Sequence, residues 1–146
     1  MLLVAALPIG ELRAAIPLGL VQYEMHPLWA YSLGVIGNMI PVPFLLLLLS
    51  KVSDLLRRMS IFDRFLTWLF AYTQRRHSAL FNKFGAFALI VFVAIPLPAT
   101  GAWSGSLAAV LFGVPFKHAL PLIALGVMIA GILVTLSVLG IWSFFK

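Results

Sequence analysis

Two oppositely charged side chains stand close together in an otherwise apolar segment near the start of the chain. Glu11 and Arg13 lie in the run from Leu7 to Gly19, which two prolines and two glycines interrupt. In the centre of a membrane-spanning helix each charge would cost about 2.5–3.5 kcal/mol, so both need a compensating role. The planar Arg13 guanidinium suits an anionic group such as phosphate, which it binds through paired hydrogen bonds.

Glu11 admits two roles. A carboxyl group in an apolar segment can take up and release a proton, or it can serve only to hold Arg13 in place. Residues two apart lie on different faces of a regular helix, so a direct pair between Glu11 and Arg13 requires the broken backbone that Gly10 permits. The sequence leaves both roles open.

A second interrupted segment, from Ile95 to Gly105, carries hydroxyl groups in place of charges. Thr100, Ser104 and the backbone around Gly101 can donate hydrogen bonds to a solute. The same small hydroxyls can instead satisfy neighbouring backbone carbonyls. The segment is therefore a second candidate binding element.

The proline spacing relates the two segments to each other. Pro8 stands 19 residues before Pro27, and Pro96 stands 19 residues before Pro115, which is an offset of 88 residues between the halves. A register shared at a fixed offset is typical of an internal repeat.

The composition predicts an integral membrane protein. Hydrophobic residues make up 63% of the chain and charged residues 10%, with a mean hydropathy of +1.12, whereas soluble domains are roughly half apolar. Cysteine is absent, so disulfides and thiolate chemistry are excluded. The three histidines stand in different regions of the chain, which indicates no metal site and no catalytic triad. We expect no enzyme activity and no cofactor beyond a coupling proton or cation.

Uncharged run lengths predict the membrane topology. The runs Pro27–Ser50 and His118–Phe145 are long enough to span, since a spanning helix needs about 20 apolar residues. The 33 residues of Phe84–Phe116 exceed one crossing but fall short of the roughly 40 that two crossings need, so we expect a re-entrant hairpin. Leu2–Tyr23 is too interrupted to span alone and is expected to form another hairpin.

These elements predict an all-α integral membrane fold with a single membrane domain over 1–146. Each half of an inverted repeat would be a re-entrant helical hairpin followed by a transmembrane helix, over 1–50 and 84–146. The intervening segment, 51–83, holds seven basic residues and is predicted to be a cytoplasmic linker by the positive-inside rule. Its apolar residues recur at helical spacing, which favours amphipathic helices on the surface of the inner (cell) membrane or against a partner subunit.

The net charge of +6 lies mostly in this linker, so it indicates contact with anionic lipids and no nucleic-acid binding.

Two further residues are candidates for the lining of a solute site. Asn38, with Pro41 and Pro43 after it, predicts a kink and a polar lining in the first spanning helix. Its amide can contact a solute or hydrogen-bond a carbonyl of the hairpin. Trp103 can line the cavity, or it can serve in packing or as an anchor at the membrane interface. On the same helix, Gly34 and Gly37 are expected to form a close-packing face.

Three ordered motifs resemble the putative small multidrug export protein family. They are Leu7-Pro-Ile-Gly-Glu-Leu-Arg-Ala-Ala-Ile-Pro17, Gly37-Asn-Met-Ile-Pro-Val-Pro43 and Phe92-Val-Ala-Ile-Pro-Leu-Pro-Ala-Thr-Gly-Ala-Trp103. That family is in turn similar to the DedA superfamily, whose members have two re-entrant hairpins and are implicated in moving lipid phosphates such as undecaprenyl phosphate. The resemblance implies a substrate site made from both hairpins, which adds Pro17, Pro96, Pro98, Thr100, Gly101 and Trp103 to Glu11 and Arg13. The arginines that DedA proteins carry in the second hairpin are absent here.

We therefore expect a small transporter that moves an anionic, lipid-linked phosphate by alternating access between inverted halves. The alternatives are a proton-coupled exporter of cationic drugs and a membrane scaffold that transports nothing. The expected partners are membrane lipids, either undecaprenyl phosphate or phospholipid. Two full spans can hardly shield two hairpins, so a homodimer or larger homo-oligomer is expected.

Overall fold

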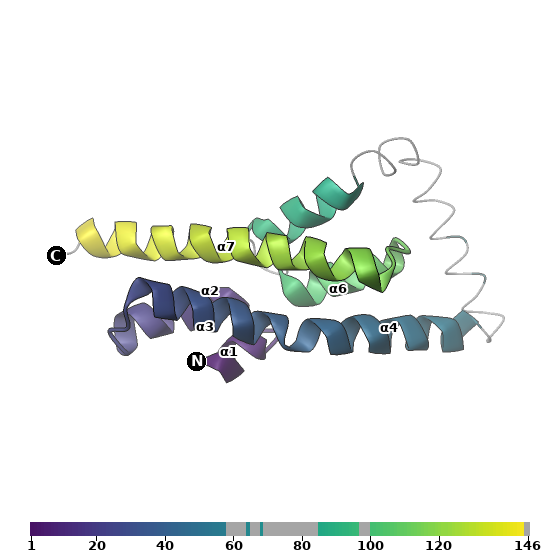
Figure 1. The fold of residues 1–146 in the computed structure, drawn as a ribbon, viewed down its shortest axis with the longest axis horizontal. Coiled ribbons are helices and arrows are strands. Elements are labelled where there is room, and N and C mark those ends of the chain that lie inside the picture. Colours follow the sequence, from purple (N-terminus) through teal and green to yellow (C-terminus); the bar gives the residue numbers. More distant parts are fainter. Residues whose placement is uncertain (58–63, 65–67, 69–84, 97–99, 145–146) are drawn as a thin grey trace.

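The computed structural model describes residues 1–57, 64, 68, 85–96 and 100–144, and the regular secondary structure among them is helical (Figure 1). The all-α prediction is confirmed for this part of the chain. The elements, in order, are α1 (Leu2–Ala6), α2 (Glu11–Pro17), the π-helical turn η1 (Leu18–Gln22), α3 (Pro27–Met39), α4 (Pro41–Arg57), a helix over Gly85–Ala94, α6 (Ala102–Leu111) and α7 (Phe116–Phe144).

Two long helical rods form the frame of the molecule. The first is α3 followed by α4, and the second is α7, which runs alongside it in the opposite direction (Figure 1). Each contains a stretch long and apolar enough to cross a membrane, over Pro27–Val52 and Phe116–Ile141. The predicted kink is found at Ile40, between α3 and α4, because Pro41 has no N–H with which to continue the ladder of α3.

Short helices at the N-terminus form a broken pair. α1 and α2 pack on each other and on α3, and residues 7–10 make the turn between them. The break expected at Pro8 is therefore present. The expectation that Pro17 also interrupts the helix was wrong, because Pro17 ends α2 and the chain continues directly into η1. The widened hydrogen bond of η1 begins after the proline, since the N–H of Tyr23 donates to the carbonyl of Leu18 at 3.2 Å.

Glycines on α3 let the broken pair approach closely. A Cβ atom on Gly37 would lie 2.7 Å from the carbonyl oxygen of Leu2, and one on Gly34 would lie 2.9 Å from Cγ1 of Ile16. Larger residues at either position would push α1 or α2 away from the frame. The predicted close-packing face is confirmed.

The helix over Gly85–Ala94 and α6 form a second broken pair. Residues 95–101 separate these two helices, so the expected interruption of the apolar run is present. The break was expected to extend to Gly105, which was wrong, because α6 already begins at Ala102. On α7, a Cβ atom at Gly126 would lie 2.6 Å from that of Val93. Glycine thus allows close packing between the second pair and the frame.

The turns of the two broken pairs meet near the middle of the molecule (Figure 1). Buried apolar side chains of both pairs and of the frame pack into one core around this point: Leu12, Ile16, Val42, Leu46, Leu89, Val93, Ile123 and Val127. Outside this core, the frame helices leave large apolar side chains exposed, including Phe44, Leu48, Ile132 and Leu136. An apolar exterior of this kind suits a lipid environment.

Most of the predicted linker over 51–83 lies outside the described residues. Its first part, 51–57, continues α4.

Candidate functional site

The carboxylate of Glu11 caps the N-terminus of α6. The N–H of Ala102 donates to Oε2 at 3.2 Å, and the N–H of Trp103 donates to Oε1 at 3.3 Å. Helix N-termini carry partial positive charge and N–H groups that have no partner within the helix. Glu11 is 8% exposed, so this contact also supplies hydrogen bonds to a buried charge. Glu11, which directly follows the first turn, thereby stabilises α6, which directly follows the second turn.

This cap depends on the absence of a side chain at Gly101. The residue has φ 156° and ψ −158°, a conformation that is essentially restricted to glycine. A Cβ atom added there would collide with Oε2 of Glu11 and come within 2.6 Å of its Cδ. Glu11 itself has φ 47°, which is uncommon for a residue with a side chain. The backbone is therefore unusual on both sides of the contact.

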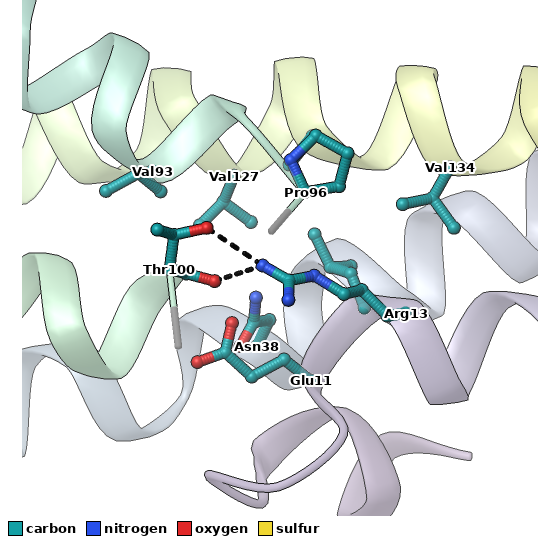
Figure 2. Close-up of a pocket in the computed structure, with 11 residues that line it drawn as sticks. Glu11, Arg13, Asn38, Val93, Pro96, Thr100, Val127 and Val134 are labelled. Atoms are coloured by element: carbon teal, nitrogen blue, oxygen red, sulfur yellow. Dashed lines mark hydrogen bonds between the residues drawn. The ribbon is translucent and has the colours of Figure 1, made fainter. Parts of the chain in front are cut away.

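Arg13 joins the same two turns through Thr100. Its Nη2 donates to the carbonyl oxygen of Thr100 and, at 3.0 Å, to the hydroxyl Oγ1 (Figure 2). That hydroxyl in turn donates to the carbonyl of Ile95 at 2.6 Å. Nearby, the indole Nε1 of Trp103 donates to the carbonyl of Ala6 at 3.0 Å. These contacts, with the Glu11 cap, hold the two turns together.

Within the described residues, Glu11 and Arg13 do not form a salt bridge. They influence each other through space, but each makes its hydrogen bonds with the second turn. Of the five N–H donors of a guanidinium, those on Nε and Nη1 of Arg13 have no acceptor in the described part of the chain. The direct Glu11–Arg13 pair considered from the sequence is therefore not the observed arrangement.

Two pockets lie on either side of this contact. The outer pocket is open and has a volume of about 570 Å³. Its walls come from the first turn and the start of α2 (residues 8–10, Glu11, Arg13 and Ala14), and from the second turn and the start of α6 (Thr100, Trp103 and Ser104). The inner pocket has room of about 10 Å³. Glu11, Arg13 and Thr100 line both pockets, so they form the partition between them.

Asn38 reaches the inner pocket from α3. Its side chain is 1% exposed, and its amide lies beside the carboxylate of Glu11 (Figure 2). The carbonyl oxygen Oδ1 has no hydrogen-bond partner in the described part of the chain. The sequence favoured a bond from Asn38 to a hairpin carbonyl, but in the described part of the chain its amide lies beside the carboxylate of Glu11 (Figure 2).

The structure brings most of the predicted site residues together. Glu11, Arg13, Thr100, Trp103 and Ser104 line the outer pocket, and Asn38, Pro96 and Gly101 line the inner one with the partition residues. The hydroxyl of Ser104 donates to the carbonyl of Gly101 at 3.4 Å, so it satisfies a neighbouring carbonyl.

Two predicted residues are not placed at the site. Pro17 lines neither pocket, and Pro98 lies outside the described residues.

Sequence reasoning missed the apolar walls of the inner pocket. Val127, Ala130 and Val134 of α7 line it, together with Val93. Their spacing places them on one face of a helix. Because almost every residue around α7 is apolar, the sequence pattern does not distinguish the face that meets the pocket from the face that meets lipid.

In a comparison with protein families, the chain matches the family described as "Putative small multi-drug export protein" over residues 11–133. The matched region begins at Glu11, directly after the first turn, and includes the second turn and most of the frame. The chain belongs to this family. Searches of curated proteins and of solved structures found no match. Membership of an export protein family, together with the two candidate spans, indicates a membrane protein.

Proposed function

We propose that the protein is a small multi-pass transporter of the inner (cell) membrane that moves a solute with an anionic group, and that Arg13 binds this group. The observation that carries the proposal is the state of the Arg13 guanidinium. It lines the open outer pocket, it forms no salt bridge with a described residue, and its Nε and Nη1 donors have no acceptor there.

The distribution of charge around the two turns supports an anionic solute. The negative charge of Glu11 is matched by two N–H groups at the positive end of α6. Among the described residues, Arg13 makes its hydrogen bonds with the neutral oxygens of Thr100. A pocket with an unpaired guanidinium attracts anions and repels cations. Because phosphate oxygens match the fork of a guanidinium, a phosphate is the favoured group.

Apolar walls of the outer pocket support a solute with a hydrocarbon part. Pro8, Ile9, Ala14 and Trp103 lie beside Arg13 in its lining, and Ile9 is 94% exposed. A lipid-linked phosphate would place its head group on Arg13 and its chain against these side chains or in the surrounding lipid. The resemblance to the DedA superfamily suggests undecaprenyl phosphate or a phospholipid as the lipid.

The arrangement of the broken pairs supports alternating access. Their turns meet from opposite ends of the frame, which is the arrangement expected of two re-entrant hairpins in an inverted repeat. Contacts between the turns would separate on one side while the solute passes. Such turns must be shielded from lipid, and two frame helices give little cover, so we include a homodimer or larger homo-oligomer in the proposal.

Export of cationic drugs is the second candidate, because the family description names multidrug export and Glu11 lines both pockets. In that mechanism Glu11 would bind a proton or the cation in turn. The neighbouring charge of Arg13 opposes it. A scaffold that transports nothing is the third, and it requires neither charge.

Binding to the purified protein in detergent micelles tests these candidates. The probes are dihexyl phosphate, the uncharged trihexyl phosphate with the same chains, and the lipophilic cation tetraphenylphosphonium. We expect dihexyl phosphate alone to bind, and Arg13→Ala to weaken it at least about tenfold, since a hydrogen bond to a charged group contributes about 1.5–3 kcal/mol. Arg13→Lys keeps the charge but loses the fork, so it should restore only part of the affinity.

Lys117→Ala is the matched control, because Lys117 is an exposed cation that lies outside both pockets, and this variant should bind like the wild type. Equal binding of dihexyl phosphate by wild type and Arg13→Ala would refute the proposal. Binding of tetraphenylphosphonium that is lost in Glu11→Gln would establish the second candidate in its place.

A further inference from the structure

Asn38 holds a buried hydrogen-bond acceptor that is unfilled. Its side chain is 1% exposed, and Oδ1 has no partner in the described part of the chain. Leaving such a group unpaired is unfavourable, and folded proteins rarely do so. The acceptor therefore indicates that a donor reaches it in another state of the protein.

The surroundings of Asn38 offer few possible donors. The helix over Gly85–Ala94 and α7 contribute only apolar side chains to the inner pocket, from Val93, Val127, Ala130 and Val134. Arg13 is the single charged group facing Glu11 in this lining, and its Nη2 is bound to Thr100. The room of about 10 Å³ lies at the lower limit for one water molecule. Within the described lining, the donor that can newly form beside Asn38 is the O–H of Glu11, once its carboxylate has bound a proton.

We propose that Asn38 is the positioning residue for a proton-binding site at Glu11, because its amide can pair with both protonation states. When Glu11 is ionised, Nδ2 of Asn38 donates to the carboxylate. When Glu11 is protonated, the amide turns over and Oδ1 accepts the new O–H. The proton comes from water in the outer pocket, which Glu11 also lines, and it returns to water there, so a single O–H bond forms and breaks.

This inference rests on the proposed function in one respect: the solute that binds together with the proton is the anion assigned to Arg13. Protonation of Glu11 removes the negative charge from the partition, and the positive charge of Arg13 remains. The net charge of the pocket therefore rises by one unit. It also replaces the strong cap on Ala102 and Trp103 by a neutral one, which weakens the contact between the turns. Proton and anion would then bind together, and the contact would loosen as they do so.

The sequence makes a direct test practical. Asparagine occurs only at 38 and 82, and glutamate only at 11 and 24. Protein labelled with ¹³C at the side-chain carbonyls of Asn and Glu would give four signals by NMR in micelles, assigned with Asn82→Gln and Glu24→Gln. We expect the signals of Asn38 and Glu11 to follow single-proton curves with one shared midpoint. In Glu11→Gln the Asn38 signal should not change with pH. A Glu11 signal that titrates while that of Asn38 stays constant, or a Glu11 signal that never titrates, would overturn the inference.

A substitution separates this role from a purely structural one. In Asn38→Leu the ionised carboxylate keeps its two backbone donors, whereas the protonated form loses its acceptor. The proton affinity of Glu11 should therefore fall about tenfold or more. If Asn38 served only as a donor to the carboxylate, the proton affinity would rise. Thr135→Val removes another buried hydroxyl, bonded to Gly131, and should leave the titration unchanged.

Repeating the titration of Glu11 in the presence of dihexyl phosphate tests this inference separately from the proposed function. The wild type should bind a proton more tightly when the anion is present, and Arg13→Ala should not. This diester stays ionised over the whole titration, so the linked proton belongs to the protein. If Asn38 and Glu11 titrate together but the anion has no effect, the anion role of Arg13 is refuted and the assignment of Asn38 stands.

Discussion

Replacing Gly101 by alanine should break the contact between the two turns. The new Cβ would occupy the place of Oε2 of Glu11 and lie within 2.6 Å of its Cδ, so the carboxylate has to leave the N-terminus of α6. Two hydrogen bonds to a charged group would be lost. At 3.2 and 3.3 Å they are long, so we assign about 1.5 kcal/mol to each. The glycine-only backbone conformation adds about 1–3 kcal/mol. The expected loss of stability is about 4–6 kcal/mol.

Two other glycines separate the parts of this estimate. Gly113 also has a positive φ, 70°, but a Cβ atom there would meet nothing within 4 Å, so Gly113→Ala measures backbone strain alone and should cost about 1 kcal/mol. Gly140 lies in α7 and likewise has open space around it. Gly140→Ala should therefore be neutral or stabilising by up to about 1 kcal/mol. Unfolding in mixed micelles of mild detergent and dodecyl sulfate, followed by circular dichroism, compares the three variants.

A double-mutant cycle with Glu11 tests the mechanism of the loss. Glu11→Ala removes the cap by itself and should cost about 3 kcal/mol. In the double variant the Cβ introduced at position 101 no longer meets a carboxylate, so only the cost of backbone strain is added. The double variant should then be about 3 kcal/mol more stable than the sum of the single effects predicts. Additive effects, or a Gly101→Ala variant no worse than Gly113→Ala, would refute the assignment of the cap.

Three further outcomes are expected. Trp103→Phe keeps the ring but removes the N–H that donates to the last carbonyl of α1, and should cost about 1 kcal/mol in the same unfolding assay; no loss would mean that the indole only packs. Gly37→Ala would place a Cβ atom 2.7 Å from a backbone carbonyl of α1, so α1 should become more susceptible to proteolysis, and unchanged protection would contradict its packing on α3. Cysteines introduced at Ser60 and Ser143 test the predicted topology with an impermeant thiol reagent applied to intact cells: only position 143 should react, and labelling of position 60 alone would reverse the orientation.

The architecture follows largely from local properties of the sequence. Long apolar runs predict the frame helices, because their backbone groups must pair internally in lipid. Proline without an N–H predicts the break before Pro41. At Pro17 the same rule failed, because the chain continues from α2 directly into the π-helical turn η1. The second break ended earlier than predicted, at Gly101, because the cap from Glu11 supplies acceptors for the first N–H groups of α6.

By itself, the sequence determined that Glu11 and Arg13 matter, since charges in an apolar segment are too costly to be incidental. It also determined that the second broken segment would offer hydroxyl and backbone groups. The tertiary structure alone decided which groups meet. Arg13 and Thr100 are 87 residues apart, and Glu11 and Trp103 are 92 apart, and helical periodicity relates only residues within a few positions of each other. The unfilled oxygen of Asn38 likewise appears only when three segments pack around it, because burial is a property of the packed neighbours and not of the residue.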